Sequence, residues 1–225
     1  MIKMGPKIVS VEANIGAGKT TLLRLLKNTS SPIGSGRYEL VFLEEPVNEW
    51  EQIKDSKGVN IIEKFYSNQE KYAFSFQIMA YISRLVSVKN AVEKNKDKDC
   101  FIICERSLWT DRFVFAKMLH DNSKIEDVNF QIYLRWFNEF VNDIKLDALF
   151  YIPTDPELCF QRIKKRNRTG EVIELEYLNE CDKYHREWLN NKNFIPPEKI
   201  LRIDPNFTES IKYNIYEFLD IFFSN

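Results

Sequence analysis

Short apolar runs alternate with longer amphipathic segments along the whole chain. The runs are rich in β-branched and aromatic residues, which is typical of buried strands. They cover residues 7–12, 39–44, 100–104, 148–152 and 199–203. The segments between them have helical spacing, and we expect helices at residues 19–28, 60–94, 107–119, 126–143, 155–167, 173–190 and 208–223. Alternation of strands and helices predicts a parallel sheet with helical crossovers.

The order of these elements predicts the fold class α/β, a doubly wound five-stranded parallel sheet with helices on both faces. Ligands of such a sheet bind at the carboxyl ends of its strands. We expect the long helix to be broken near Ser67-Asn68, and connecting loops from Gly34 to Gly36 and from Glu93 to Asp99. The 225 residues contain no repeat, low-complexity segment or long linker, so one domain spanning 1–225 is expected.

Composition and charge narrow the class of protein. The chain is 44% hydrophobic and 14% aromatic, which excludes intrinsic disorder. Its net charge of −1 gives no reason to expect a nucleic-acid or membrane partner, and no apolar run approaches the ~20 residues that span a bilayer. The N-terminal segment MIKMGPK is too short for a signal or transit peptide, so we expect a cytoplasmic location.

The cysteines also favour a cytoplasmic location, where thiols stay reduced. None has the spacing of a metal site or a CxxC motif, and two of them flank the strand-like run CFIIC, where cysteine packs as a small hydrophobe. We expect reduced thiols at all four positions, which are Cys100, Cys104, Cys159 and Cys181.

A glycine-rich turn separates the first strand from the first helix. Residues 13–20 fit the phosphate-binding loop with one departure, because Ala13 stands where the pattern begins with glycine. In such a loop backbone N–H groups surround a phosphate, Lys19 reaches the β and γ oxygens, and the Thr20 hydroxyl ligates Mg²⁺. A chance glycine-rich turn is the alternative, but strand, loop, Lys-Thr and helix stand in the required order. The residues expected to bind the triphosphate are Ala13, Asn14, Ile15, Gly16, Ala17, Gly18, Lys19, Thr20 and Thr21.

Two carboxylates follow strands that should end beside this loop. Glu45 comes after the second strand and Glu105 after the third. A carboxylate there can ligate Mg²⁺ or accept a proton from an attacking hydroxyl. An alcohol acceptor needs such a base, whereas a phosphate acceptor is already ionised. Glu45 can equally be a solvated charge at a strand end, and the pattern alone leaves both interpretations open.

Several motifs, in a fixed order, resemble those of the deoxyribonucleoside kinase family, which includes deoxycytidine, deoxyguanosine and insect multisubstrate kinases. They span residues 8 to about 210, and the ERS…DR element and the FxFQ helix are specific to this family. The resemblance implies a P-loop kinase fold and an enzyme that phosphorylates a deoxynucleoside 5′-hydroxyl with ATP and Mg²⁺. The matching elements are EANIGAGKTT (12–21), EEPVNEW (44–50), FSFQ (74–77), SR (83–84), ERSLWTDRFVFA (105–116), RIKKRNR (162–168) and LEYL (175–178).

The resemblance implies roles at the reacting end of the site. Glu45 aligns with the general base that deprotonates the 5′-hydroxyl, and Arg106 with the arginine that orients this base. Glu105 aligns with the acid that is associated with Mg²⁺, so Thr20 and Glu105 are the expected metal ligands. The expected catalytic residues are Glu45, Arg106, Lys19 and Arg162.

The resemblance also implies a deoxynucleoside pocket. Gln77 aligns with the glutamine whose amide pairs with the base edge, a role that suits a side chain with both donor and acceptor. Phe76 and Trp50 would form walls of the pocket, and Tyr66 would hold the 3′-hydroxyl. Glu171 keeps the family spacing for a second 3′-hydroxyl ligand, although the loop after it is one residue shorter. Core packing is the alternative role for the tyrosine and the phenylalanine.

A basic run with five cations in seven residues ends one of the predicted helices. Such a run is usually a solvated face, but in a phosphoryl transferase its arginines neutralise charge on the transferred group. The resemblance places Arg162, Arg166 and Arg168 in a mobile lid at about 162–172. Arg166 and Phe207 would sandwich the adenine of ATP.

Arg84 and Asp111 stand at the family positions that separate thymidine acceptors from the others. Gln77, Ala80 and Arg84 have the spacing i, i+3, i+7, which places them on one stripe of a helix. Members that accept cytosine and purines have Arg and Asp at these two places, where the ion pair would occupy the space of a thymine methyl group. A surface salt bridge is the alternative. We expect deoxyadenosine, deoxyguanosine or deoxycytidine to be accepted rather than thymidine.

Two other functions remain as alternatives. A nucleoside-monophosphate kinase such as thymidylate kinase shares the fold, but it needs a cationic acceptor site and no alcohol-activating base. A non-catalytic nucleotide switch would need a guanine-reading N-K-x-D segment after a strand, whereas Asn95-Lys96 precedes one. Family members are dimers built through two helices, and residues 70–94 and 126–143 carry surplus apolar side chains, so the resemblance implies a homodimer.

Overall fold

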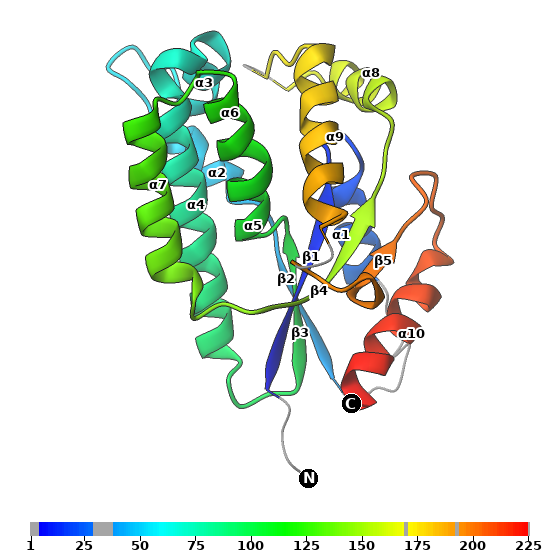
Figure 1. The fold of residues 1–225 in the computed structure, drawn as a ribbon. Helices are drawn as coiled ribbons and strands as arrows, with labels where there is room; N and C mark the ends of the chain where they lie inside the picture. Colours follow the sequence, from blue (N-terminus) through cyan, green and yellow to red (C-terminus); the bar gives the residue numbers. More distant parts are fainter. Residues whose placement is uncertain (1–4, 29–37, 169–170, 192–193, 225) are drawn as a thin grey trace.

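The computed structural model describes residues 5–28, 38–168, 171–191 and 194–224. Within them, the centre is a sheet of five parallel strands in the order β2-β3-β1-β4-β5 (Figure 1). The strands are β1 (Pro6–Ala13), β2 (Glu39–Leu43), β3 (Cys100–Glu105), β4 (Leu146–Ile152) and β5 (Ile200–Arg202). The predicted fold class is confirmed. The loop predicted from Gly34 to Gly36 lies outside the described residues.

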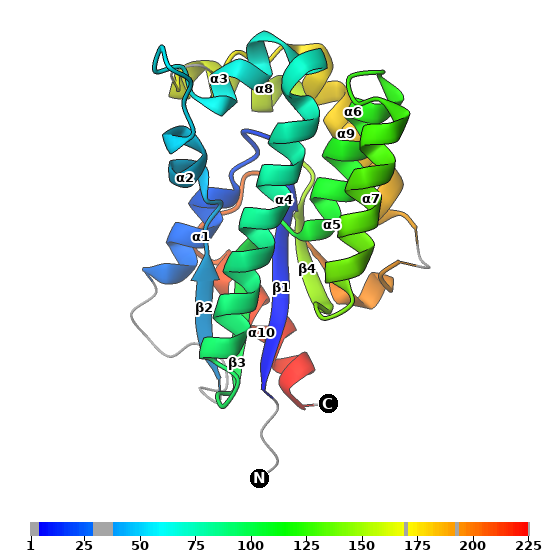
Figure 2. The ribbon, with the colours of Figure 1, turned by 90° about the vertical axis from the view of Figure 1, so that its left-hand side faces the viewer.

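Helices cover both faces of the sheet, as the alternating pattern predicts. They are α1 (Lys19–Lys27), α2 (Val47–Gln52), α3 (Ile61–Ser67), α4 (Gln69–Lys94), α5 (Leu108–Thr110), the π-helix η1 (Asp111–Ala116), α6 (Lys117–Asp121), α7 (Asp127–Val141), α8 (Pro156–Arg166), α9 (Leu175–Leu189), the 3₁₀ helix η2 (Pro197–Lys199) and α10 (Ile211–Ser224). Helices α4 and α7 lie on one face, and α1 and α10 on the other (Figure 1). The view in Figure 2 places α4 in front of the sheet.

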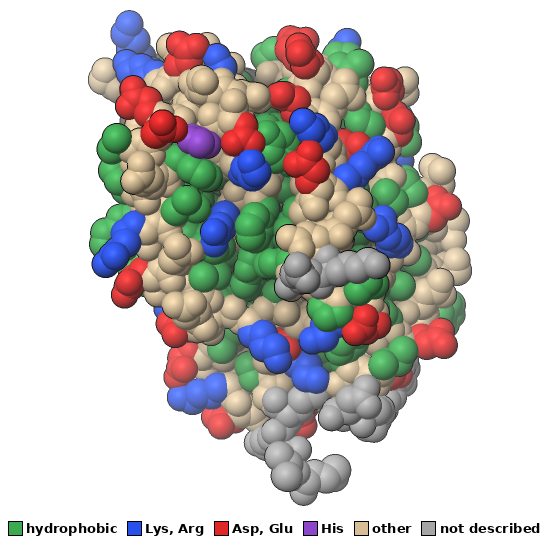
Figure 3. Space-filling model, in the orientation of Figure 1, with side chains coloured by type: hydrophobic (Ala, Val, Ile, Leu, Met, Phe, Trp, Pro, Cys, Tyr) green, Lys and Arg blue, Asp and Glu red, His purple; other side chains and the backbone are tan. Residues whose placement is uncertain are grey.

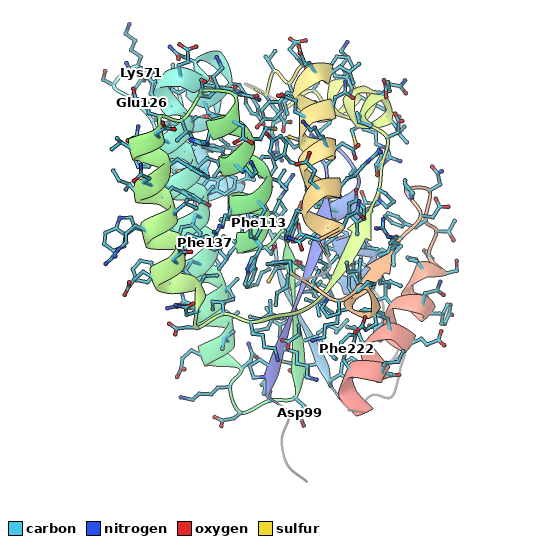
Figure 4. All side chains as sticks on the ribbon, viewed as in Figure 1. Lys71, Asp99, Phe113, Glu126, Phe137 and Phe222 are labelled. Carbon is cyan, nitrogen blue, oxygen red and sulfur yellow. The ribbon has the colours of Figure 1, made fainter. Side chains whose placement is uncertain are left out.

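Two of the five hydrophobic clusters among the described residues lie on the two faces of the sheet and include side chains of β1. Side chains of β1 alternate between them, since Val9 and Val11 pack on one side and Ile8 on the other. Phe137 of α7 and Phe222 of α10 mark the two sides (Figure 4). The four cysteines are free and buried, as the prediction of reduced thiols requires.

Two predicted helices are divided in the structure. The segment predicted at 60–94 forms α3 and α4, and Asn68 between them caps α4 by accepting a hydrogen bond from the Lys71 N–H. The break near Ser67-Asn68 is confirmed. The segment predicted as one helix at 107–119 is instead α5, η1 and α6 in succession. The prediction missed the π-helix because hydrophobic spacing does not distinguish it from a regular helix within six residues.

Short elements also escape the hydrophobic pattern. Helix α2 follows Pro46 directly and has six residues, which is too few for a periodic signal. The loop expected from Glu93 begins only at Asn95, because α4 continues to Lys94. These differences change the ends of elements and leave their order intact.

The parallel register brings the ends of three strands together. Val11 pairs with Glu105 across β1 and β3, and Ala13 pairs with Ile152 across β1 and β4. The carboxyl ends of these strands therefore lie side by side, at the end of the molecule where α3 and α8 are seen (Figure 1). This is the edge at which a doubly wound sheet binds its ligands.

Candidate active site

A cavity of about 910 Å³ opens at the carboxyl ends of the strands. This volume is within the range of ligand-binding pockets. Its walls come from segments far apart in the sequence: the loop before α1, the residues after β2 and β3, one side of α4, the end of α8 and the segment after β5. The expected site residues that line it are Ile15, Gly16, Gly18, Lys19, Thr20, Thr21, Glu45, Trp50, Tyr66, Phe76, Gln77, Arg84, Glu105, Arg106, Asp111, Arg162, Arg166, Arg168, Glu171 and Phe207.

The loop between β1 and α1 has the backbone of a phosphate cradle. Gly16 has φ +77°, and a Cβ there would lie 2.7 Å from the carbonyl oxygen of Cys159, so both conformation and space require glycine. Gly18, with φ +105°, is the N-cap of α1 and directs the helix N-terminus toward the cavity wall. This arrangement places backbone N–H donors where an anion can bind.

Lys19 is buried at the start of α1. Its Nζ donates to the carbonyl oxygens of Asn14 at 2.8 Å and Ala13 at 3.2 Å. Burial and the nearby charge of Arg106 lower the pKa of Lys19 to about 8. The carboxylates of Glu105, Glu45 and Glu12 act in the opposite direction without restoring the usual pKa, and phosphate oxygens in the cavity would favour the charged amine further.

The side chains of Ala13, Asn14 and Ala17 do not line the cavity, and the predicted binding of the triphosphate by these loop residues stays a prediction. All three are buried, and Ala13 ends β1 inside the core. The Asn14 side chain instead donates to the carbonyl oxygen of Leu178 and accepts from the Ile15 N–H, both at 2.8 Å. Ala13 has no positive φ, so alanine fits where the pattern has glycine.

Glu45 is the most constrained carboxylate of the cavity. Arg106 Nη1 donates to its two carboxylate oxygens at 2.8 and 2.9 Å, and Arg84 Nη2 donates to Oε1 at 3.0 Å. Burial alone would raise the pKa of Glu45, but the two arginines outweigh it and lower this pKa to about 2. The side chain is 17% exposed, so it is ionised and still open to the cavity.

Glu105 and Arg106 are consecutive residues, yet both line the cavity. Successive side chains of an extended strand point to opposite faces. Arg106 has φ +64°, and this left-handed turn directly after β3 directs both side chains to the same space. The conformation costs about 1 kcal/mol or more in a residue other than glycine, and such strain occurs mainly at functional sites.

A pair of oxygen ligands lies beside the phosphate cradle. The Thr20 hydroxyl donates to Glu105 Oε1 at 3.0 Å. Hydroxyl and carboxylate oxygens suit Mg²⁺, which in phosphoryl transferases keeps water and phosphate oxygens as its other ligands. Among the described residues, no cluster of three or more His, Cys, Asp or Glu side chains is placed to hold a metal ion. The hydroxyl of Thr20 and the carboxylate of Glu105 fit a cation whose other ligands are phosphate and water oxygens.

Arg84 connects two carboxylates of the cavity, Asp111 and Glu45. Its guanidinium donates to Asp111 from Nε at 2.9 Å and to the carbonyl oxygen of Glu105 from Nη1 at 2.7 Å. Arg84 and Asp111 are both buried, so this ion pair is not the surface salt bridge that the sequence left open. The contact between Arg84 and Glu45 was not expected from the sequence.

The predicted helix stripe on α4 faces the cavity. Gln77, Ala80 and Arg84 all line it. Gln77 is 3% exposed, and within the described residues its Oε1 has no hydrogen-bond partner. A buried amide oxygen without a partner costs free energy unless a ligand donates to it. Phe76 and Trp50 pack edge to face with ring centroids 5.6 Å apart and form an aromatic wall beside this amide.

The segment predicted to form a lid also lines the cavity. Glu171 forms an ion pair with Arg166. Burial raises the pKa of the Tyr66 hydroxyl, and the nearby negative charge of Glu171 is the second largest cause of this shift. Arg162 donates to the carbonyl oxygen of Ala17 at 3.1 Å, which places its guanidinium against the phosphate cradle. The adenine sandwich between Arg166 and Phe207 stays a prediction.

Three of the lining residues that the sequence analysis missed carry polar or aromatic side chains of special interest. Tyr177 lies on α9, within the LEYL motif, but its role could not be read from helical spacing. Phe115 lies in η1 and packs under the Arg106 guanidinium, with 5.2 Å between the ring centroid and the carbon of the guanidinium. Arg24 enters from the second turn of α1, and only its spacing of four residues from Thr20 could have indicated it.

Together, the parallel sheet, the phosphate cradle and the ionised carboxylate beside an aromatic pocket define a P-loop phosphotransferase of the α/β class. The sequence model of the deoxynucleoside kinase family matches residues 9–222. The chain therefore belongs to the deoxynucleoside kinase family, and it is a kinase that uses ATP to phosphorylate deoxynucleosides for nucleotide salvage.

Similar proteins carry related names. The chain is 34% identical over 226 residues to a probable deoxycytidine kinase of Fowlpox virus, covering 95% of this chain and 88% of that protein. It is 30% identical over 207 residues to the mitochondrial deoxyguanosine kinase of Xenopus laevis, covering 84% and 76%. It is also 30% identical over 233 residues to the deoxycytidine kinase of Homo sapiens, covering 92% and 86%. No helix in the described part of the chain has both the length and the apolar character needed to cross a membrane.

Proposed function

We propose that this kinase transfers the γ-phosphate of ATP to the 5′-hydroxyl of a deoxynucleoside, with Glu45 as the general base. The observation that carries the proposal is the position of Glu45, whose carboxylate lines the cavity between the phosphate cradle and the aromatic pocket. An alcohol must lose its proton as it attacks phosphorus, and a carboxylate within hydrogen-bond reach can accept it. The bonds from Arg106 and Arg84 keep Glu45 ionised and fix its direction.

The cations around the phosphate cradle would neutralise the negative charge of the transferred phosphoryl group. Lys19 contacts the phosphate loop at Asn14 and Arg162 contacts it at Ala17, where they would meet the negative charge that spreads over the transferred group. Arg166 and Arg168 extend the cationic wall of the cavity and would act as a lid. Thr20 and Glu105 would hold Mg²⁺, which supplies further neutralisation of the phosphate oxygens when it is bound.

The acceptor pocket favours bases other than thymine. The unpartnered Oε1 of Gln77 can accept a hydrogen bond from the edge of a base, while Phe76 and Trp50 would enclose its ring. The buried pair of Arg84 and Asp111 would fill the space of a thymine methyl group, and the carboxylate can accept from an exocyclic amino group. Deoxyadenosine, deoxyguanosine and deoxycytidine are therefore the proposed acceptors. Tyr66 and Glu171 would hold the 3′-hydroxyl at the other end.

A homodimer and a cytoplasmic location complete the proposal. Helix α7 exposes Val128, Ile132 and Trp136 on one face, and their exposed fractions are 65%, 42% and 47%. Apolar side chains reach the surface along the side of the molecule where α7 lies (Figure 3). A second copy of this chain is the occupant that we propose for this face.

A coupled assay of ADP release tests the proposed reaction. ATP and Mg²⁺ are supplied with deoxyadenosine, deoxyguanosine, deoxycytidine or thymidine in turn, and thymidine monophosphate serves as the acceptor for the rival monophosphate kinase. We expect release with the first three and little with thymidine or its monophosphate. Turnover with the monophosphate alone would overturn the proposal.

A paired substitution tests the proposed base preference. Arg84→Met together with Asp111→Ala should raise the ratio of kcat/KM for thymidine to that for deoxycytidine. The ratio cancels any general loss of activity from the contact between Arg84 and Glu45. Arg112→Met is the matched control, since Arg112 contacts Phe113 and Phe137 away from the cavity. A wild-type preference for thymidine would contradict the proposed specificity and leave the kinase activity intact.

A further inference from the structure

Glu12 is a fully buried carboxylate that the proposed reaction does not use. It lies in β1, one residue before the phosphate loop, and is 0% exposed. Its Oε2 accepts a hydrogen bond from the hydroxyl of Thr110, while its Oε1 has no partner among the described residues. A fully buried carboxyl group with one hydrogen-bond partner is costly to the fold, and its one bond is made to Thr110.

Thr110 lies between two residues of the active site. Four residues before it, Arg106 makes the left-handed turn that directs its guanidinium to Glu45. Directly after it, Asp111 begins the π-helix η1 and pairs with Arg84. A displacement of Thr110 would therefore move the groups at both the reacting end and the base end of the cavity.

Hydrogen bonds connect Thr110 to the turn after β3. Its backbone N–H donates to Ser107 Oγ at 3.3 Å, and the two hydroxyl oxygens are 3.4 Å apart. Ser107 follows Arg106 directly, and the Arg106 N–H donates to the carbonyl oxygen of Val11 at 3.1 Å. The turn is thus tied to β1 at two points, by the backbone of Val11 and by the side chain of Glu12.

We propose that Glu12 is a positioning residue, which holds the segment from Arg106 to Asp111 in register with β1 through its bond to Thr110. This inference rests on the proposed roles of Arg106 and Asp111. It follows that the bond matters for turnover because it keeps a strained turn in place, and that neither Glu12 nor Thr110 needs to touch a substrate.

Substitutions at Thr110 separate the hydrogen bond from the packing. Thr110→Val keeps the shape and removes the donor, and we expect kcat/KM for the deoxynucleoside to fall roughly 10- to 100-fold, the size expected for a small misplacement of catalytic groups. The KM for ATP should change much less, because the groups that Thr110 positions, Arg106 and Asp111, are proposed to act on the deoxynucleoside. Thr110→Ser restores the hydroxyl and should restore most of the activity.

Glu12→Met removes the same bond and leaves no unpartnered carboxyl oxygen in the core. Replacing a buried polar group by an apolar side chain of similar volume often leaves stability unchanged or raised. We therefore expect Tm to be maintained while kcat/KM falls. The acidic limb of the kcat/KM profile should also move to higher pH, since a displaced Arg106 no longer holds the pKa of Glu45 low. Ser10→Ala is the control: its hydroxyl is buried in the same strand and has no partner among the described residues, so kinetics should not change.

The outcomes distinguish this inference from the proposed reaction. If Thr110→Val and Glu12→Met fold normally and keep wild-type kinetics and pH profile, Glu12 has no positioning role, whatever happens to Tm. If Thr110→Ser is as impaired as Thr110→Val, the hydroxyl is not the group that matters, and the inference is again wrong. The proposed reaction is tested by a different variant. If that reaction is wrong, Glu45→Gln stays fully active.

Discussion

Arg84 and Arg106 hold the carboxylate of Glu45, and they make it a weaker base that stays ionised. A group with a pKa of about 2 is a weak base in isolation, but it is ionised throughout the physiological range. Proton transfer to it becomes favourable late in the reaction, when the forming bond to phosphorus makes the hydroxyl more acidic. The arginines therefore favour a fixed and charged acceptor over a strong one.

Glu45→Gln tests this role directly. The amide keeps the shape and removes the proton acceptor, so kcat should fall by about 10²-fold or more, the usual size of general-base catalysis. Deoxynucleoside affinity should change much less. Glu49→Gln is the control, since Glu49 is an exposed acid on α2 that does not line the cavity. Near-normal turnover of Glu45→Gln in a single-turnover experiment would show that another group accepts the proton.

Lys19 should take up a proton when ATP binds. Its pKa of about 8 means that roughly half of the molecules carry a neutral amine at pH 8. Phosphate oxygens next to the amine favour the charged form and raise this pKa. Calorimetric titration with ATP and Mg²⁺ at pH 8, in two buffers of different ionisation enthalpy, should therefore give different observed enthalpies.

Lys19→Arg provides the control for this titration. The guanidinium is charged at every accessible pH, so its binding enthalpy should not depend on the buffer. Equal enthalpies in both buffers for the wild-type protein would mean that Lys19 is already fully protonated before ATP arrives.

The end of α8 carries the positive charge that we propose to face the phosphates. Arg162 contacts the phosphate loop at Ala17, whereas Lys165, three residues further on, is exposed and does not line the cavity. Arg162→Ala should lower kcat by about 10²-fold with little change in deoxynucleoside affinity, because the arginine meets charge that develops on the transferred group. Lys165→Ala should leave both constants unchanged. A loss of deoxynucleoside affinity at unchanged kcat would instead place Arg162 in acceptor binding.

Elements with a strong periodic signal could be predicted from the sequence. The five strands, the long helices and the break at Asn68 follow from apolar spacing and from the capping side chain. The π-helix η1 and helix α2 could not be predicted, because six residues carry too little pattern. Within the site, the resemblance predicted residues that line the cavity, while their roles stay predictions. It could not predict that Arg84 reaches from Asp111 to Glu45, since this depends on the distance between two elements.

The assembled sheet explains why the site draws on nearly the whole chain. Parallel strands place β1, β2 and β3 with their carboxyl ends at one edge, and the segments that follow each strand supply Lys19, Glu45 and Arg106 in turn. Residues about 60 positions apart, such as Glu45 and Arg106, thereby come within 2.8 Å. The outer face of α7 takes no part in this cavity, which leaves its apolar side chains for another purpose.

That face should pair with a second copy of the chain. Val128, Ile132 and Trp136 border a shallow hollow of about 340 Å³, and exposed apolar side chains clustered on one helix are typical of an interface. We expect light scattering after size-exclusion chromatography to give twice the chain mass of 26.8 kDa for the wild type and a single chain mass for Ile132→Glu with Trp136→Glu, because a charge at the centre of such an interface has no partner. Tyr213→Glu, at an exposed aromatic on α10, should leave the mass of the wild type unchanged. A wild-type mass of 26.8 kDa at micromolar concentration would mean that this face of α7 is not a homodimer interface.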